Sequence, residues 1–375
     1  MNTKEYDAII VGASFAGLAV ARQLRGRILL LDRHEVGEVQ TSACGTPLWV
    51  PQALGVERSV LQVHRTVVVH APTRTVLYDI SDVPYCTFDY RKFCRGLLEQ
   101  TQARVLRTPV HRIRDGAVET EAGRFEAPCI VDCSGWRSAR LHDADDQTPG
   151  PVSFGLETVA DYQGEALYFW AAPGPLRHVI SWIFPTGPAS RVGVGSYAGD
   201  SKLKAPLASF MDGLGMAPTR YHGTYFPSGL RAPTAGTVFV AGDAAGQCLP
   251  LTAEGIRPAL YFGEQCGLIV QRVIEGRLSL AQGLAEYRGR VLAYRWAYRR
   301  LRWAQWAVQQ VPRRWLGGMA EIARRTQRRW WPQYAHFGGL QERRAQRIDD
   351  VPAVRRAKHA ARELRPGARG DEERG

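Results

Sequence analysis

The chain has 375 residues, 45% of them hydrophobic and 23% charged, and its formal net charge is +13. This composition excludes a disordered chain, a collagen-like fibre and a small disulfide-stapled protein, and the length suits roughly two or three domains. The seven cysteines, an odd number without a Cys-x-x-Cys pair, favour a reducing compartment over a disulfide framework or a zinc ribbon.

We expect a cytoplasmic protein. Glu5 and Asp7 precede the first apolar run, which Gly12 then interrupts, so this start does not resemble a secretory signal. No run of about 18 uninterrupted apolar residues occurs, so we predict no membrane-spanning helix.

Residues 7–32 have the pattern of a strand, a glycine turn, a helix and a second strand. The apolar run Asp7-Ala-Ile-Ile-Val-Gly12 is followed by Ala-Ser-Phe-Ala-Gly17, and the second apolar run ends at Asp32, twenty positions after Gly12. In a dinucleotide site the first glycine permits the turn, Gly17 lets the helix pack on the strand, and the acid holds a ribose hydroxyl. Ser14 stands in place of the second glycine. The alternative is an ordinary glycine turn, but the complete pattern favours a pyrophosphate at the helix start.

Three later segments indicate, by resemblance, which dinucleotide cofactor is bound. Residues 238–256 contain Gly242-Asp243 and Gly255-Ile256 and resemble the Gly-Asp motif of flavoproteins. Residues 130–138, around Gly135, resemble the Asp-Gly strand and loop of the same superfamily, and Asp89-Tyr-Arg91 resembles its arginine segment. The chain thus resembles FAD-dependent enzymes of the para-hydroxybenzoate hydroxylase fold group. The resemblance implies that FAD is bound by Gly12, Ser14, Ala16, Gly17, Asp32, Arg33, Arg91, Gly135, Gly242, Asp243, Gly255 and Ile256.

The same resemblance implies an α/β fold with a discontinuous, Rossmann-like FAD-binding domain. We assign residues 1–50, 86–150 and 235–275 to that domain, and residues 51–85 and 151–234 to an antiparallel β-sheet domain that binds substrate. A basic helical region is expected over 276–349, followed by a disordered tail over 350–375.

Two smaller motifs resemble the geranylgeranyl reductase family. Trp182 and Phe184 lie in a segment similar to its aromatic Tyr-x-Trp-x-Phe-Pro box, with Ile180 nearest the expected tyrosine, and Trp170 precedes it. Cys44-Gly45 resembles the segment that faces the flavin in that family. The alternative is a monooxygenase or halogenase acting on a small aromatic or lipophilic substrate. Halogenases carry a related box, but they also need a lysine beside the substrate, and no lysine here is clearly placed for it.

The family resemblance implies reduction of C=C bonds in a prenyl chain. Trp170, Trp182 and Phe184 are expected to wall a lipophilic tunnel, although aromatic strand residues are more often plain core. Cys44, with Gly45 and Trp182 at the catalytic centre, is the candidate proton donor or positioning residue; the alternative is a buried, inert thiol. NAD(P)H or a ferredoxin-like protein is the expected electron donor, because no second dinucleotide fingerprint occurs. We predict no metal site.

The C-terminal region carries the excess positive charge. From Arg288 onward there are 22 Lys and Arg but 8 Asp and Glu, out of 49 and 36 in the whole chain, and six of the ten tryptophans. Apolar rows at helical spacing begin at Leu284 and again after Pro312, with arginines beside them. This pattern favours peripheral attachment to the inner face of the cell membrane, most of all over 312–335. The alternative is a helical cap on the enzyme body. We predict no nucleic-acid partner.

Overall fold

A six-stranded, mostly parallel sheet forms around the first two predicted strands in the computed structural model, which describes residues 6–40, 42–114, 116–138, 152–171 and 179–335. Its order is β18 (Thr234–Ala235), β19 (Val238–Val240), β12 (Cys129–Asp132), β1 (Ala8–Val11), β2 (Ile28–Asp32) and β8 (Arg104–Arg107). Only β18 runs antiparallel to its neighbour. The strands come from separated parts of the chain, so the predicted α/β class and its Rossmann-like sheet are confirmed. The exact domain boundaries stay a prediction.

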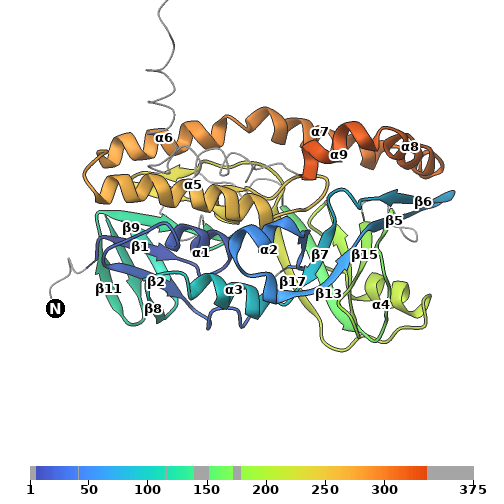
Figure 1. Ribbon diagram of the computed structural model, residues 1–375, viewed down its shortest axis with the longest axis horizontal. Helices are drawn as coiled ribbons and strands as arrows, with labels where there is room; N and C mark the ends of the chain where they lie inside the picture. Colours follow the sequence, from blue (N-terminus) through green and yellow to red (C-terminus); the bar gives the residue numbers. More distant parts are fainter. Residues whose placement is uncertain (1–5, 41, 115, 139–151, 172–178, 336–375) are drawn as a thin grey trace, which may run out of the picture. The chain divides into compact units, whose positions relative to one another are not determined.

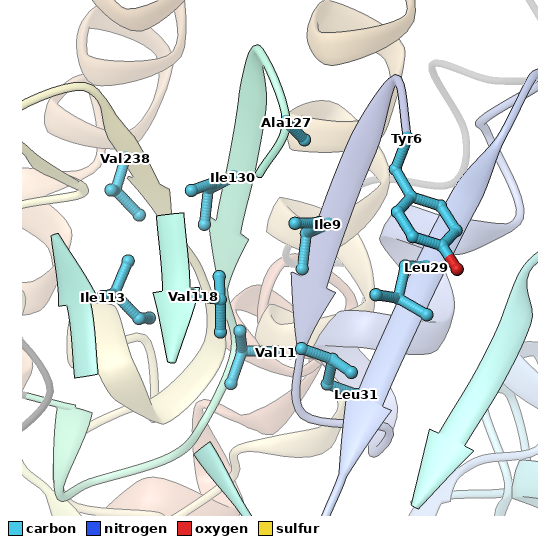
Figure 2. Close-up of a cluster of buried hydrophobic side chains, with 10 residues drawn as sticks. All are labelled: Tyr6, Ile9, Val11, Leu29, Leu31, Ile113, Val118, Ala127, Ile130 and Val238. Atoms are coloured by element: carbon cyan, nitrogen blue, oxygen red, sulfur yellow. The ribbon is translucent and has the colours of Figure 1, made fainter. Parts of the chain in front are cut away.

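Both faces of this sheet are covered. On one face α1 (Phe15–Ala21) packs against α5 (Ile256–Ile274), and α3 (Tyr90–Leu98) lies beside α1. On the other face lies a three-stranded sheet of β9 (Val110–Arg114), β10 (Ala117–Thr120) and β11 (Gly123–Glu126). Figure 2 shows the buried cluster between the two sheets, in which Ile9, Val11 and Ile130 meet Ile113 and Val118. This burial explains why β1 and β12 are apolar on both faces.

A second large sheet contains seven strands. Its order is β17 (His222–Pro227), β13 (Val152–Ala160), β16 (Ser190–Ser196), β15 (Val179–Pro185), β14 (Leu167–Ala171), β5 (Thr66–Ala71) and β6 (Arg74–Asp79). The predicted antiparallel sheet is confirmed in its other pairs, but β14 and β5 are parallel. These two strands come from segments far apart in the chain, so no hairpin turn constrains their directions. α4 (Lys204–Asp212) packs on one face of the sheet, with Leu207 and Met211 in the buried cluster.

A small sheet connects the two large ones. It consists of β3 (Gly45–Pro47), β7 (Tyr85–Phe88) and β4 (Val60–His64), accompanied by α2 (Trp49–Leu54) and the 3-10 turn Glu57–Ser59. The guanidinium of Arg191, on β16, donates to the carbonyls of Ala43 and Phe88 at 3.2 and 3.0 Å. The loop before β3 is thereby held against the seven-stranded sheet.

Four further helices follow α5 in the described chain: α6 (Leu280–Leu292), α7 (Arg295–Gln310), α8 (Arg313–Arg325) and α9 (Gln327–Ala335). These helices lie along one side of the sheets, and α8 contacts β5 and β6 (Figure 1). The row predicted from Leu284 spans two helices, because a turn at Ala293–Tyr294 separates α6 from α7. Tyr287, Val291 and Tyr298 of this row are buried. The Tyr287 hydroxyl donates to the Val240 carbonyl, and the Tyr298 hydroxyl donates to the Gln247 carbonyl. These two helices therefore cap the enzyme body.

None of the helices within the described ranges combines the length and the apolar character needed to cross a bilayer. The predicted disorder of 350–375 concerns residues outside the described ranges.

Candidate active site

The glycine turn after β1 has the geometry expected of a dinucleotide site. Gly12 has a φ of +100°, and a Cβ atom on it would lie 2.3 Å from the carbonyl oxygen of Cys133. A Cβ atom on Gly17 would lie 1.8 Å from the carbonyl oxygen of Gly12. Only glycine fits both positions, so the turn closes tightly and α1 begins directly behind it. The backbone N–H groups of the first helical turn are then available to an anion.

Asp32 stands at the end of β2 and orders the same turn. Its carboxylate accepts hydrogen bonds from the backbone N–H groups of Ala13 at 2.7 Å and His34 at 2.8 Å. Ser14, directly before α1, places its hydroxyl 3.0 Å from that of Tyr90. The serine at the second fingerprint position thus links the turn to α3.

A cavity of about 1600 Å³ extends from this turn to the face of the seven-stranded sheet opposite α4. Most of the predicted FAD-binding residues line it: Gly12, Ser14, Ala16, Asp32, Arg33, Gly135, Gly242, Asp243, Gly255 and Ile256. Gly17 and Arg91 are outside the lining. Gly17 lies beneath the turn, and Arg91 pairs at 3.2 Å with Glu35, whose side chain reaches the cavity. Arg91 therefore faces this region only through Glu35.

Asp243 lies in the 3-10 turn Gly242–Ala245, which begins just after β19. Burial raises the pKa of its carboxyl to about 6, and the nearby Arg231 guanidinium opposes that rise. A partly buried carboxylate on the cavity wall suits a ligand with hydroxyl groups, because a donated hydrogen bond would favour its ionised form. The ribityl chain of FAD has such hydroxyls. The glycine turn, Asp32 and Asp243 together therefore fit FAD.

The aromatic part of the cavity follows the alternation of the strands. Phe169, Trp182 and Phe184 line the cavity, and the ring of Phe184 packs against Gly45, where a Cβ atom would lie 2.7 Å from that ring. The prediction that Trp170 belongs to this wall is wrong. Trp170 points to the opposite face of β14, where it stacks on His70 and contacts Phe210 of α4. Neighbouring residues of a strand face opposite sides, so Phe169 takes the place assigned to Trp170.

Cys44 does not reach the cavity, although Ser42, Ala43 and Gly45 do. Its side chain is fully buried, and the thiol donates to the carbonyl oxygen of Ser42 at 3.3 Å. Burial raises the pKa of the Cys44 thiol to about 12. These contacts argue against the predicted proton donor and favour the alternative of a buried thiol that shapes the loop beside Gly45.

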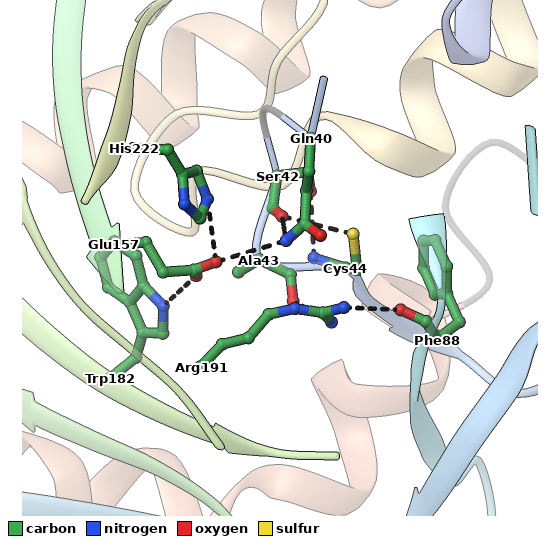
Figure 3. Close-up of polar contacts among 9 residues, drawn as sticks. All are labelled: Gln40, Ser42, Ala43, Cys44, Phe88, Glu157, Trp182, Arg191 and His222. Carbon is green, nitrogen blue, oxygen red and sulfur yellow. Dashed lines mark hydrogen bonds and ion pairs between the residues drawn. The ribbon is translucent and has the colours of Figure 1, made fainter. Parts of the chain in front are cut away.

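Sequence reasoning missed a polar group on the cavity wall, formed across three strands. Glu157 and His222 are directly paired residues of β13 and β17, and Glu157 and Trp182 are both paired with Gly193 of β16. The Trp182 indole N–H donates to Glu157 at 2.9 Å, and His222 Nε2 lies 3.2 Å from the other carboxylate oxygen. Gln40 completes the group at 3.4 Å (Figure 3). The Glu157 side chain is only 5% exposed.

A glycine makes this contact between second-neighbour strands possible. A Cβ atom on Gly193 would lie 2.2 Å from the Trp182 ring, so the indole lies across the bare backbone of β16 to reach Glu157. The alternating glycines Gly193 and Gly195 were the available sequence signal, because glycine inside a strand often marks a close approach.

The C-terminal helices supply the outer wall, which sequence reasoning also missed. Their cavity-lining residues are Leu301, Val308, Leu316, Met319, Ala320, Ala323, Thr326, Trp330, Trp331 and Tyr334. α8 is tied to the sheet by the Tyr78 hydroxyl, which donates to the Ala320 carbonyl at 2.7 Å. The buried pair Glu254 and Arg257 holds the end of α9, since Tyr334 donates to Glu254 at 2.6 Å. Most of this wall is apolar.

Solved structures share this fold, whereas no protein-family profile and no curated protein sequence matches the chain. A geranylgeranyl bacteriochlorophyll reductase-like protein from Thermoplasma acidophilum has a TM-score of 0.75 and 16% identity, over 95% of this chain and 99% of that one. PqsL, a probable FAD-dependent monooxygenase from Pseudomonas aeruginosa, has a TM-score of 0.65 and 17% identity, over 84% and 98%. The myxobacterial chondrochloren halogenase CndH has a TM-score of 0.63 and 15% identity, over 86% and 89%. The chain therefore has the FAD-binding, Rossmann-like flavoprotein fold.

Proposed function

We propose that the protein is an FAD-dependent oxidoreductase that reduces C=C bonds of a prenyl chain of the geranylgeranyl type. The observation that carries this proposal is the continuity of the cavity from the glycine turn to an aromatic and apolar wall. Typical ligand sites have roughly 300–1,000 Å³, so about 1600 Å³ suits a cofactor together with a long substrate. The similarity to the reductase-like structure supports the fold in which we place this chemistry.

Each part of the site has a distinct task in this proposal. The glycine turn, Asp32 and Asp243 hold FAD, which supplies the hydride when it is reduced. Trp182, Phe184 and Phe169 hold the chain and exclude water from the reacting carbons. Their ring faces also stabilise positive charge that develops on the carbon skeleton. NAD(P)H or a ferredoxin-like protein restores the reduced cofactor.

The alternative, a monooxygenase or halogenase, uses the same fold, as PqsL and CndH illustrate. Of the described lysines, Lys92, Lys202 and Lys204, none lines the cavity. This arrangement favours the reductase over the halogenase.

Mass spectrometry of the product tests the proposal. A geranylgeranyl substrate incubated anaerobically with the purified protein and dithionite should gain about 2 Da for each saturated bond. An unchanged chain under these conditions, with an oxygen or halogen adduct formed in air with NAD(P)H, would establish the alternative instead.

Variants of Trp182 connect this activity to the cavity wall. Trp182→Ala should retain bound FAD but lose prenyl turnover, because the cofactor residues lie elsewhere while the wall is opened. Trp182→Phe keeps an aromatic wall and removes only the indole donor, so it should retain substrate binding. Full turnover in Trp182→Ala would contradict the role of Trp182 in the substrate-binding wall.

We also propose that α7 and α8 present a membrane-binding face. Its apolar members are all exposed: Trp296, Trp303, Trp306, Trp315, Met319 and Ile322. Residues 295–335 contain ten arginines and one acid, Glu321, which is paired with Arg324 and Arg325. The arginines complement the negative charge of an anionic lipid surface, and the exposed tryptophans suit the boundary between headgroups and acyl chains. Met319 also lines the cavity, so this face adjoins the outer wall of the proposed prenyl site.

A further inference from the structure

We infer that His222 is the proton donor of this site and that Glu157 is its positioning residue, an inference that rests on the proposed reduction of a C=C bond. Saturating such a bond adds a hydride to one carbon and a proton to the other. The two electrons come with the hydride from reduced flavin, and the proton must come from a group that touches the substrate. Imidazole is the side chain best suited to this transfer near neutral pH.

The position of His222 fits this task. His222 lines the cavity on the same face of the sheet as Trp182. The two residues lie in one line across the paired strands, with Glu157 and Gly193 between them. Nε2 is directed at Glu157, which leaves Nδ1 as the nitrogen that can deliver the proton. The side chain is 34% exposed, so solvent can return the proton to the imidazole after each turnover.

Glu157 is itself held in one orientation. One carboxylate oxygen accepts from the Trp182 indole, while the other faces His222 and Gln40. An anion fixed beside an imidazole holds the ring in one orientation and accepts its Nε2–H, which leaves Nδ1 free for proton transfer. The buried carboxylate would be costly without these partners, so the group acts as a unit.

Other acids on the cavity wall have different partners. Asp32 accepts two backbone N–H groups, and Glu254 is paired with Arg257 and Tyr334. Glu35 is paired with Arg91 and Arg95. Cys44 lies behind the loop. His222 is therefore the group on the sheet wall that combines access to the cavity with an anionic partner.

Single-turnover kinetics test the donor. His222→Gln should slow oxidation of the dithionite-reduced flavin by geranylgeranyl diphosphate by roughly 10²- to 10⁴-fold. Reduction of the flavin and binding of the prenyl probe should stay at wild-type levels. The matched control is His111→Gln, the same substitution at an exposed histidine of β9 outside the cavity lining, and it should react at the wild-type rate. His222→Gln with wild-type single-turnover rates would overturn the assignment, and a wild-type protein that leaves the chain unreduced would overturn the proposed function as well.

Chemical labelling tests the pair without turnover. Geranylgeranyl diphosphate bound to the FAD-free protein should protect His222 from diethyl pyrocarbonate, as read by peptide mass mapping. In Glu157→Gln the labelling of His222 should accelerate several-fold, because loss of the carboxylate weakens the contact that occupies Nε2. Thermal stability and FAD content of that variant should match the wild type. Absence of protection, or unchanged labelling in Glu157→Gln, would contradict the pair.

Discussion

At the scale of one residue, we expect the Asp243 carboxyl to make FAD binding depend on pH. Its pKa of about 6 in the protein without ligand lies above the ordinary 3.8, so ionisation opposes folding there. The protein without FAD should lose stability as pH rises from about 4 to about 6. A hydrogen bond donated by a hydroxyl of FAD stabilises the ionised carboxylate. The affinity for FAD should therefore reach its maximum above pH 6 and fall below it.

Fluorescence titrations with FAD between pH 5 and 8 measure this dependence. Asp243→Asn should abolish the slope and weaken binding at pH 7.5 by roughly ten- to a hundredfold, since hydrogen bonds to a charged group contribute about 1.5–3 kcal/mol. Asp161→Asn, at an exposed position, is the control and should keep the wild-type slope. The same slope in Asp243→Asn would assign the pH dependence to another group.

Strand β16 acts as a spacer at the scale of one element. Gly193→Ala would place a methyl group 2.2 Å from the Trp182 ring and so displace the indole from Glu157. We expect destabilisation by about 1–3 kcal/mol, together with loss of prenyl turnover and retention of FAD. Calorimetry measures the destabilisation, mass spectrometry of the product measures the turnover, and the FAD absorbance measures the retained cofactor.

Gly155→Ala is the matched control for this substitution. Its methyl group would meet the same indole at 3.7 Å, an ordinary van der Waals distance. Gly155→Ala should therefore stay close to the wild type. Equal behaviour of the two alanine variants would contradict the spacer role of Gly193.

At the scale of the whole molecule, we expect attachment to a membrane surface. The full chain should co-sediment with anionic phospholipid vesicles and dissociate as salt is raised from about 0.1 to 1 M, since the screening length falls from about 10 to 3 Å. The double variant Trp303→Ser/Trp315→Ser should bind roughly tenfold less, whereas Leu214→Ser, at another exposed apolar position, should bind normally. Equal binding of both variants, or retention by duplex DNA but not by vesicles, would count against this surface.

Local sequence determined the cofactor half of the protein. The chain from Asp7 to Asp32 specifies a strand, a turn, a helix and a second strand through short-range steric rules, so the turn and the parallel sheet could be predicted. The apolar row from Leu284 likewise identified the buried faces of α6 and α7, because helical periodicity is a local signal. The break between α6 and α7 at Ala293–Tyr294 could not be predicted, because the spacing of apolar residues continues through the turn.

Tertiary structure alone decided the substrate half of the site. His222, Glu157 and Trp182 are far apart in the chain and meet only because β17, β13, β16 and β15 pair in one register. The same pairing directs Phe169, and not Trp170, into the cavity, and the fold of the loop buries Cys44. Which side of a strand faces a ligand depends on what packs on its other side. Here α4 takes one face, and the other is left open to the cavity.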